Sequence, residues 1–172
     1  MAQSFVNQIG NIGAILRAIV TAPGMVDVER AVAAARAVTR WEDQDFVSQV
    51  SPPDVTQYGE AGDPGPRIGI VDLGLKTNIV RAMRHRGAVV RVFPHTASAS
   101  EVLSSDIDGI ILSPGPGDPA RLIDQVALAR AVIDDGRPLL GICLGHQIVA
   151  RAAGAETRRL AFGHHGANHP VA

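Results

Sequence analysis

Short apolar runs alternate with amphipathic stretches over the second half of the chain. The runs are rich in Val, Ile and Leu with few polar interruptions, which is typical of strands buried on both faces of a sheet. They are Arg67–Leu73, Ala88–Phe93, Ile107–Leu112 and Pro138–Ile142. Helical periodicity fills most of the intervals between them. This alternation predicts a parallel, doubly wound α/β sheet.

Two of the intervals have a clear helical stripe. Thr77–Arg86 gathers its apolar side chains on one face and is followed by Gly87. Ala120–Asp135 repeats apolar residues at helical spacing and is followed by Gly136. Glycine commonly ends a helix, so both boundaries are expected there. Ligands of such folds bind beyond the carboxyl ends of the strands, and both Gly-rich segments of this sequence follow strands.

The composition changes between the two halves of the chain. Pro52–Pro66 holds four prolines and three glycines and almost no large aliphatic side chain, so it is expected to be a linker. Residues 67–172 then form the α/β domain. Residues 1–51 belong to a separate part, in which Asp27 can cap an alanine-rich helix. That part is too small to fold by itself.

Charge and cysteine content narrow the possible partners. The 172 residues are 46% hydrophobic and carry 16 basic and 17 acidic side chains, giving a net charge of −1. A net charge this small gives no overall electrostatic attraction to nucleic acid or to a membrane surface. Small metabolites and proteins are therefore the expected partners. One cysteine cannot form an intrachain disulfide, and neither a spanning segment nor a secretory signal is present. A cytoplasmic location is expected.

That single cysteine lies where an apolar strand passes into a helical segment. Cys143 has Gly141 and Gly145 on either side, in a G-x-C-x-G pattern. A nucleophile on a strained strand-to-helix turn needs neighbours without Cβ atoms. The first turn of the following helix would also favour a thiolate. A lone Cys among Leu and Ile can instead be a small buried hydrophobe, but the flanking glycines favour the nucleophile.

A second Gly-rich loop, Ser113–Pro119, follows another predicted strand. It therefore leaves the same edge of the sheet as Cys143. A rigid Pro/Gly loop can point backbone N–H groups at a developing oxyanion, and Gly115 is the candidate donor. A phosphate-binding loop is the alternative, but its G-x-x-x-x-G-K-[ST] pattern is absent and Pro116 has no N–H. By itself such a loop is more often a simple turn.

A His-rich tail, Phe162–Pro170, raises the question of a metal site. His165 and His169 have i, i+4 spacing, which makes a metal pair only on a helix. The glycines and proline of the tail disfavour a helix, and no Cys, Asp or Glu completes a ligand set. No metal site is expected. His146 lies close to Cys143 in sequence, but on the first helical turn it need not face the thiol.

The two loops together resemble the class I glutamine amidotransferases, which share a flavodoxin-like, mostly parallel sheet and a cysteine elbow. The motifs are Gly-Ile-Cys143-Leu-Gly-His-Gln147 and Ser-Pro-Gly115-Pro-Gly117-Asp-Pro. Within that family, Phe162–Pro170 is similar to the small, glutamine-hydrolysing subunits of carbamoyl phosphate synthetases. The residues after the first strand, and parts of 1–51, resemble the same subunits.

The resemblance implies a chemistry and a set of roles. Cys143 would attack the side-chain amide of L-glutamine and release ammonia, with the amides of Gly115 and Leu144 as oxyanion donors. Gly117 and Gln147, together with Gly115 and Leu144, would contact the glutamine. Ammonia would pass to a large synthetase subunit that binds ATP and Mg²⁺ and makes carbamoyl phosphate for arginine and pyrimidine synthesis. This chain would need no cofactor.

The sequence departs from the family pattern at both ends. The family's base histidine and its glutamate come from a Gly-His-Pro-Glu segment that this sequence lacks. We therefore expect a fragment without either end of the full subunit, with a remnant of a small N-terminal domain and little glutaminase activity. Two alternatives stay open: a glutaminase subunit of another class I enzyme, such as an anthranilate synthase-like one, or a non-catalytic binding module.

Overall fold

The computed structural model describes residues 27–39 and 43–158. The chain divides into two compact units, one of which runs from Trp41 to Thr157. The described residues of the other unit include helix α2, Val28–Ala37. The Asp27 side chain caps α2 by accepting the backbone N–H of Glu29 at 3.0 Å, as the sequence predicts.

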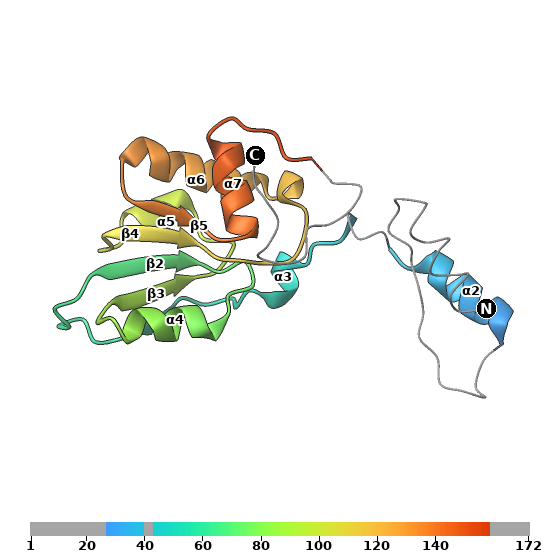
Figure 1. Cartoon of the computed structure of the whole chain (residues 1–172), viewed down its shortest axis with the longest axis horizontal. Helices are drawn as coiled ribbons and strands as arrows, with labels where there is room; N and C mark the ends of the chain where they lie inside the picture. Colours follow the sequence, from blue (N-terminus) through green and yellow to red (C-terminus); the bar gives the residue numbers. More distant parts are fainter. Residues whose placement is uncertain (1–26, 40–42, 159–172) are drawn as a thin grey trace, which may run out of the picture. The chain divides into compact units, whose positions relative to one another are not determined.

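The larger unit contains a five-stranded sheet of order β1-β3-β2-β4-β5, drawn in Figure 1. All neighbouring strands are parallel except β1, which runs antiparallel to β3. The strands are β1 Thr56–Tyr58, β2 Arg67–Val71, β3 Val89–Phe93, β4 Gly109–Leu112 and β5 Leu139–Gly141. The predicted fold class, a mostly parallel α/β sheet of flavodoxin-like type, is confirmed.

The register aligns the carboxyl ends of the parallel strands. Val71 at the end of β2 is the partner of Phe93 on β3 and of Leu112 on β4. Leu112 is in turn the partner of Gly141 on β5. The loops that follow these strands therefore leave the sheet at one edge, which is where the sequence places both Gly-rich segments.

Helices cover both faces of the sheet (Figure 1). Helix α4 packs on one face, where Val80 joins Ile70 and Val90 in a buried cluster. Helices α5, α6 and α7 lie on the other face, over Val71 and Leu112. Successive strand residues thus point to opposite layers. The helices are α3 Val47–Val50, α4 Thr77–Arg84, α5 Ala99–Leu103, α6 Ile123–Asp135 and α7 Leu144–Ala152.

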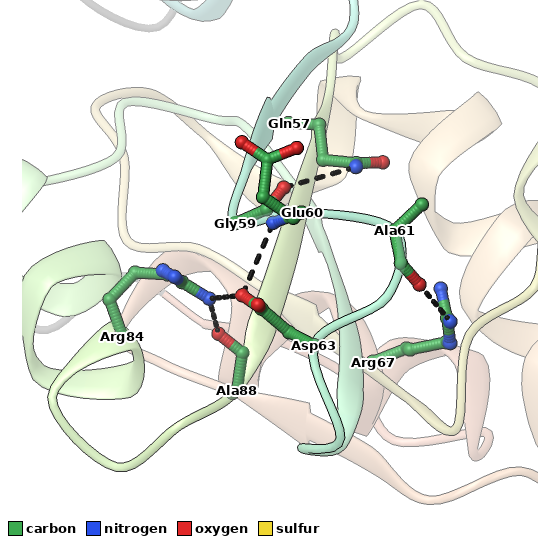
Figure 2. Close-up of polar contacts among 8 residues, drawn as sticks. All are labelled: Gln57, Gly59, Glu60, Ala61, Asp63, Arg67, Arg84 and Ala88. Carbon is green, nitrogen blue, oxygen red and sulfur yellow. Dashed lines mark hydrogen bonds and ion pairs between the residues drawn. The ribbon is translucent and has the colours of Figure 1, made fainter.

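The predicted linker Pro52–Pro66 contains β1 and is tied by side chains to α4 and, through a bond from Arg67 to the carbonyl of Ala61, to β2 (Figure 2). The Asp63 carboxylate accepts the N–H of Glu60 at 3.2 Å and pairs with Arg84 at 3.1 Å. Arg84 also donates to the carbonyl of Ala88 at 2.7 Å. The division into 1–51, 52–66 and 67–172 stays a prediction, although α3 already packs within the larger unit.

The helix expected from Ala120 begins later than the pattern indicates. Asp118 accepts the N–H of Ala120 at 2.8 Å and opens a short 3₁₀ turn, η2 Pro119–Arg121. Leu122 then adopts a ψ of 56°, which is not helical, so α6 starts at Ile123. Its end is as expected, because Gly136 has a left-handed conformation with φ of 83°.

Candidate active site

Cys143 forms the turn between β5 and α7. Its backbone has φ 54° and ψ −111°, and it is the one non-glycine residue with positive φ in the described part of the chain. Such a conformation is sterically unfavourable for a residue with a Cβ and persists only where the surroundings impose it. The residue is exposed. Strand, strained turn and helix therefore present the thiol at the carboxyl edge of the sheet.

The glycines on either side of the elbow are required by close approaches between backbones. A Cβ built on Gly141 would lie 2.5 Å from the carbonyl oxygen of Gly145. A Cβ on Gly145 would lie 2.1 Å from the carbonyl oxygen of Leu112, at the end of β4. Both distances are far below van der Waals contact, so only glycine fits. The G-x-C-x-G pattern thus has a steric cause.

Backbone hydrogen bonds fasten the elbow to the end of β4. Ile142 donates to the carbonyl of Leu112 at 3.0 Å, and Gly145 donates to the carbonyl of Ser113 at 3.2 Å. Within the elbow, Gln147 donates to the carbonyl of Cys143 at 3.2 Å. The cysteine therefore stands on a support that includes the next strand of the sheet as well as its own helix.

The loop after β4 packs closely against the loop after β2. A Cβ on Gly115 would lie 2.0 Å from the carbonyl oxygen of Leu73. Gly74 has φ 133°, and a Cβ there would lie 2.9 Å from the ring of Pro116. Gly117 differs from these two glycines, because no atom lies within 4 Å of a Cβ built on it. Its φ of 117° is what favours glycine there. The predicted oxyanion loop is thus rigidly placed.

The structure gathers the sequence-predicted site residues into two adjacent segments. Cys143, Leu144 and Gln147 lie on the elbow and the first turn of α7, and Gly115 and Gly117 lie on the loop after β4. The hydrogen bond from the Gly145 N–H to the carbonyl of Ser113, the first residue of this loop, joins the segments. Leu144 as a whole residue is 2% exposed. Gln147 is exposed.

Two polar residues at the same edge were not predicted. Asp72 follows β2, is 7% exposed, and accepts the N–H groups of Gly74 at 2.7 Å and Leu75 at 2.8 Å. Ser113 follows β4 and is fully buried. A usable signal was present in the sequence, because each is a polar residue placed directly after an aliphatic run. Both hold loop backbones in place.

A cavity of about 520 Å³ adjoins the loop after β4 at Gly117. Its wall also includes Asp45 and His95, and Cys143 does not line it. The backbone N–H of Ser48 holds the pKa of the Asp45 carboxyl below its usual value, with smaller contributions from His95 and Arg121. In the wall of this cavity, the buried Gln125 side chain donates to the carbonyl of His95 at 2.8 Å. No feature of the sequence indicated this cavity.

No metal centre is found among residues 27–39 and 43–158, where no group of His, Cys, Asp and Glu could hold an ion. The His-rich tail, Phe162–Pro170, lies outside the described residues. His146, the nearby histidine considered from sequence, is exposed on the first turn of α7. No described helix is long and apolar enough to cross a membrane.

The fold and the elbow together define a class of protein. Residues 69–172 match the family model "Glutamine amidotransferase class-I". This range includes both Gly-rich segments and most of the sheet. The chain belongs to the class I glutamine amidotransferase family.

Within the family, the similar curated proteins are named carbamoyl phosphate synthase small chain. One from Rubrivivax gelatinosus is 42% identical over 162 residues, 88% of this chain and 42% of that protein. One from Thioalkalivibrio sulfidiphilus is 39% identical over 160 residues, 86% of this chain and 42% of that protein. One from Symbiobacterium thermophilum is 51% identical over 109 residues, 63% of this chain and 30% of that protein. The resemblance predicted from the motifs is confirmed, and the chain spans less than half the length of these relatives.

Proposed function

We propose that this chain supplies the glutamine-hydrolysing site of a carbamoyl phosphate synthase. The observation that carries the proposal is the strained backbone of Cys143, at φ 54° between two glycines that admit no Cβ. Backbone strain at an exposed nucleophile is typical of a functional turn. The family match over residues 69–172 supports glutamine as the substrate.

The reaction begins with attack of the Cys143 thiolate on the carbonyl carbon of the glutamine side-chain amide. The carbonyl oxygen becomes an oxyanion, which the amide N–H groups of Leu144 and Gly115 stabilise. The C–N bond then breaks, the leaving nitrogen takes a proton from water and ammonia departs. Water attacks the resulting γ-glutamyl thioester and returns glutamate and the free thiol. Both donors are backbone groups on the two segments that the Gly145 hydrogen bond joins.

The substrate is held beside these groups. Gly117 and Gln147 contact the glutamine, together with the loop and elbow amides. Gly117 lies in the rigid loop after β4, and Gln147 is exposed one helical turn after Cys143. This placement supports binding of the amino-acid end of glutamine near the first turn of α7.

The ammonia passes to a partner, the large synthetase chain. ATP and Mg²⁺ are used there, so this chain carries out hydrolysis without a cofactor. The product, carbamoyl phosphate, enters arginine and pyrimidine synthesis in the cytoplasm. The names of the similar proteins, carbamoyl phosphate synthase small chain, support this partner.

The family's general base is a histidine in a Gly-His-Pro-Glu segment. No such segment occurs among these 172 residues. Loss of one member of a catalytic triad lowers the rate by roughly 10³-fold or more. The chain by itself is therefore expected to hydrolyse glutamine slowly and to accumulate little ammonia.

The test measures ammonia release from glutamine by the chain, alone and with a large synthetase chain, and uses mass spectrometry to detect a γ-glutamyl adduct on Cys143. The Cys143→Ser variant is the control for the nucleophile. An adduct that disappears in Cys143→Ser supports the proposal. A folded chain that binds the large chain, yet forms no adduct and releases no ammonia in either condition, would identify a non-catalytic binding module instead.

A further inference from the structure

The hydroxyl of Ser113, the residue that follows β4, makes two hydrogen bonds. The hydroxyl oxygen is 2.8 Å from the backbone nitrogen of Leu73 and 2.8 Å from the carbonyl oxygen of Pro114. An amide nitrogen can only donate and a carbonyl can only accept. The direction of both bonds is therefore fixed: the hydroxyl accepts from Leu73 and donates to Pro114. The side chain is 0% exposed, so water does not compete for either bond.

The bond to Pro114 acts on the amide of Gly115. The carbonyl of Pro114 and the N–H of Gly115 belong to one peptide group, which is planar and trans. In a trans peptide the C=O and N–H bonds point in opposite directions. A donor that holds the carbonyl oxygen therefore also sets the direction of the N–H, away from the buried hydroxyl. Donation to the carbonyl further polarises the peptide and strengthens its N–H as a donor.

The backbone of the same residue reaches the elbow. The Ser113 carbonyl accepts the N–H of Gly145, at 3.2 Å. Gly145 follows Leu144, whose amide is the other oxyanion donor of the proposed function. Ser113 is thus hydrogen-bonded to the peptide group that carries the Gly115 N–H. It is also hydrogen-bonded to Gly145, the residue after Leu144.

We propose that the Ser113 side chain is a positioning residue that aims the Gly115 N–H at the oxyanion, an inference that rests on the proposed glutaminase function. Its hydroxyl lies behind the loop and does not touch the substrate. A purely structural role would lower stability without a selective effect on the transition state. A positioning role lowers kcat more than it affects KM, because the oxyanion exists only in the transition state and the tetrahedral intermediate.

The experiment compares Ser113→Ala and Ser113→Cys with Val102→Ala, in the chain assembled with the large synthetase chain. Val102 is a fully buried residue on α5 and serves as a control for general loss of core packing. We expect Ser113→Ala to lower kcat for glutamine by about 10- to 100-fold, less than the loss of a donor itself. Ser113→Cys, whose thiol is a weaker hydrogen-bonding group, falls between Ser113→Ala and the wild type. Neither variant changes KM appreciably.

Two further measurements separate positioning from folding and from the proposed function. Alkylation of Cys143 by iodoacetamide, followed on its own peptide, forms no oxyanion and keeps its wild-type rate in both Ser113 variants. The N–H dipolar coupling of Gly115, measured by NMR, reports the direction of that bond without any need for activity. We expect it to change in Ser113→Ala and to stay unchanged in Val102→Ala.

The outcomes are distinct. A folded Ser113→Ala with the kcat of Val102→Ala, or with an unaltered Gly115 coupling, overturns the positioning role. Should Ser113→Ala fail to fold, Ser113→Cys decides by the same two readouts. A wild-type complex that neither hydrolyses glutamine nor forms the Cys143 adduct overturns the proposed function, and the Gly115 coupling then still shows whether Ser113 sets the direction of the amide.

Discussion

The loops at the two ends of the parallel strands are held by different means. At the carboxyl ends of β2, β4 and β5, backbones approach one another directly at Gly115 and Gly145, and the hydrogen bonds of the elbow join main-chain atoms. At the amino ends of β2 and β3, the segment before β2 is held by the Asp63–Arg84 ion pair, whose side chains are 33% and 34% exposed. Gly65 is the exception at this end, because a Cβ there would lie 1.8 Å from the carbonyl of Gly87.

The two ends of the parallel strands therefore differ in how well they tolerate substitutions. Backbone atoms in contact cannot move aside, so a single methyl group at the carboxyl edge must displace a strand or a helix. Ion pairs at the surface can be lost with little change, because water replaces the partner. The proposed nucleophile, which would depend on fixed distances to two amides, is better supported by the first arrangement.

The largest expected effect is that of Gly145→Ala. The new Cβ would lie 2.1 Å from the Leu112 carbonyl oxygen, so we expect the free energy of unfolding to fall by about 3 kcal/mol. Gly62→Ala is the matched control, because nothing lies within 4 Å of its Cβ, and it should change stability by less than about 0.5 kcal/mol. Urea unfolding measures both.

Gly65→Ala sharpens the same test. Its clash is as severe, but it lies at the amino edge, away from Cys143. We expect Gly65→Ala to lower stability, while the folded fraction keeps the wild-type rate of Cys143 alkylation. Gly145→Ala should lower both. Equal alkylation rates in the two folded variants would contradict the idea that glycine contacts at the carboxyl edge are what position the nucleophile.

The second effect concerns the strain at Cys143. Glycine adopts a positive φ without steric cost, whereas alanine keeps the strain of cysteine. We expect Cys143→Gly to be more stable to urea than Cys143→Ala by about 1 kcal/mol, the strain relieved less the entropy that glycine loses on folding. Both variants lose the thiol, so the comparison isolates the backbone. Cys143→Gly less stable than Cys143→Ala by about 0.5 to 1 kcal/mol, the entropic cost of glycine alone, would mean that the elbow is not strained.

The parts of the fold that the sequence predicted are those with a local signal. The aliphatic runs located β2, β3, β4 and β5 to within a few residues. Strands β2, β3 and β4 are mostly buried and need apolar side chains on both faces, whereas the edge strand β5 was expected to be buried but leaves Leu140 53% exposed. The elbow was predicted for a similar reason. Its glycines lie two residues from Cys143, and the close approaches that require them occur within the turn and at the neighbouring strand.

The parts that were missed depend on distant contacts or on weak local patterns. Strand β1 has only exposed residues and exists because it pairs with β3. Helix α5 is only five residues long, too short for a clear periodic pattern. The Ser98 and Glu101 capping box marks its start in the sequence. The hydrogen bond from the Leu73 N–H to the Ser113 hydroxyl joins residues 40 apart in sequence. No pattern within either loop could reveal that contact, which became visible only in three dimensions.

The third prediction tests the ion pair of the amino edge. A double-mutant cycle with Asp63→Asn and Arg84→Gln should give a coupling energy of about 0.5 kcal/mol, because both side chains are about two-thirds covered. The coupling should shrink in about 1 M salt, where exposed charges are screened. Arg130 and Asp134, which are 59% and 60% exposed, form the comparison pair and should couple less strongly. A salt-independent coupling near 3 kcal/mol would remove the contrast between the two edges.

The smallest effect is expected at the start of α5, where a side chain holds a loop at the carboxyl edge. The hydroxyl and then the backbone N–H of Ser98 hold the pKa of the Glu101 carboxyl below its ordinary value of 4.5. A carboxyl whose pKa is lower in the folded state stabilises the fold above its ordinary pKa, and that contribution disappears as the pH falls through the folded value. Glu101→Gln should therefore reduce stability slightly at neutral pH and weaken its decline below about pH 4.5. Urea unfolding across this range checks it, with Glu60→Gln as a control carboxyl outside the capping box. A decline identical to that of the wild type would show that the ionised Glu101 carboxylate contributes nothing to the stability of this loop.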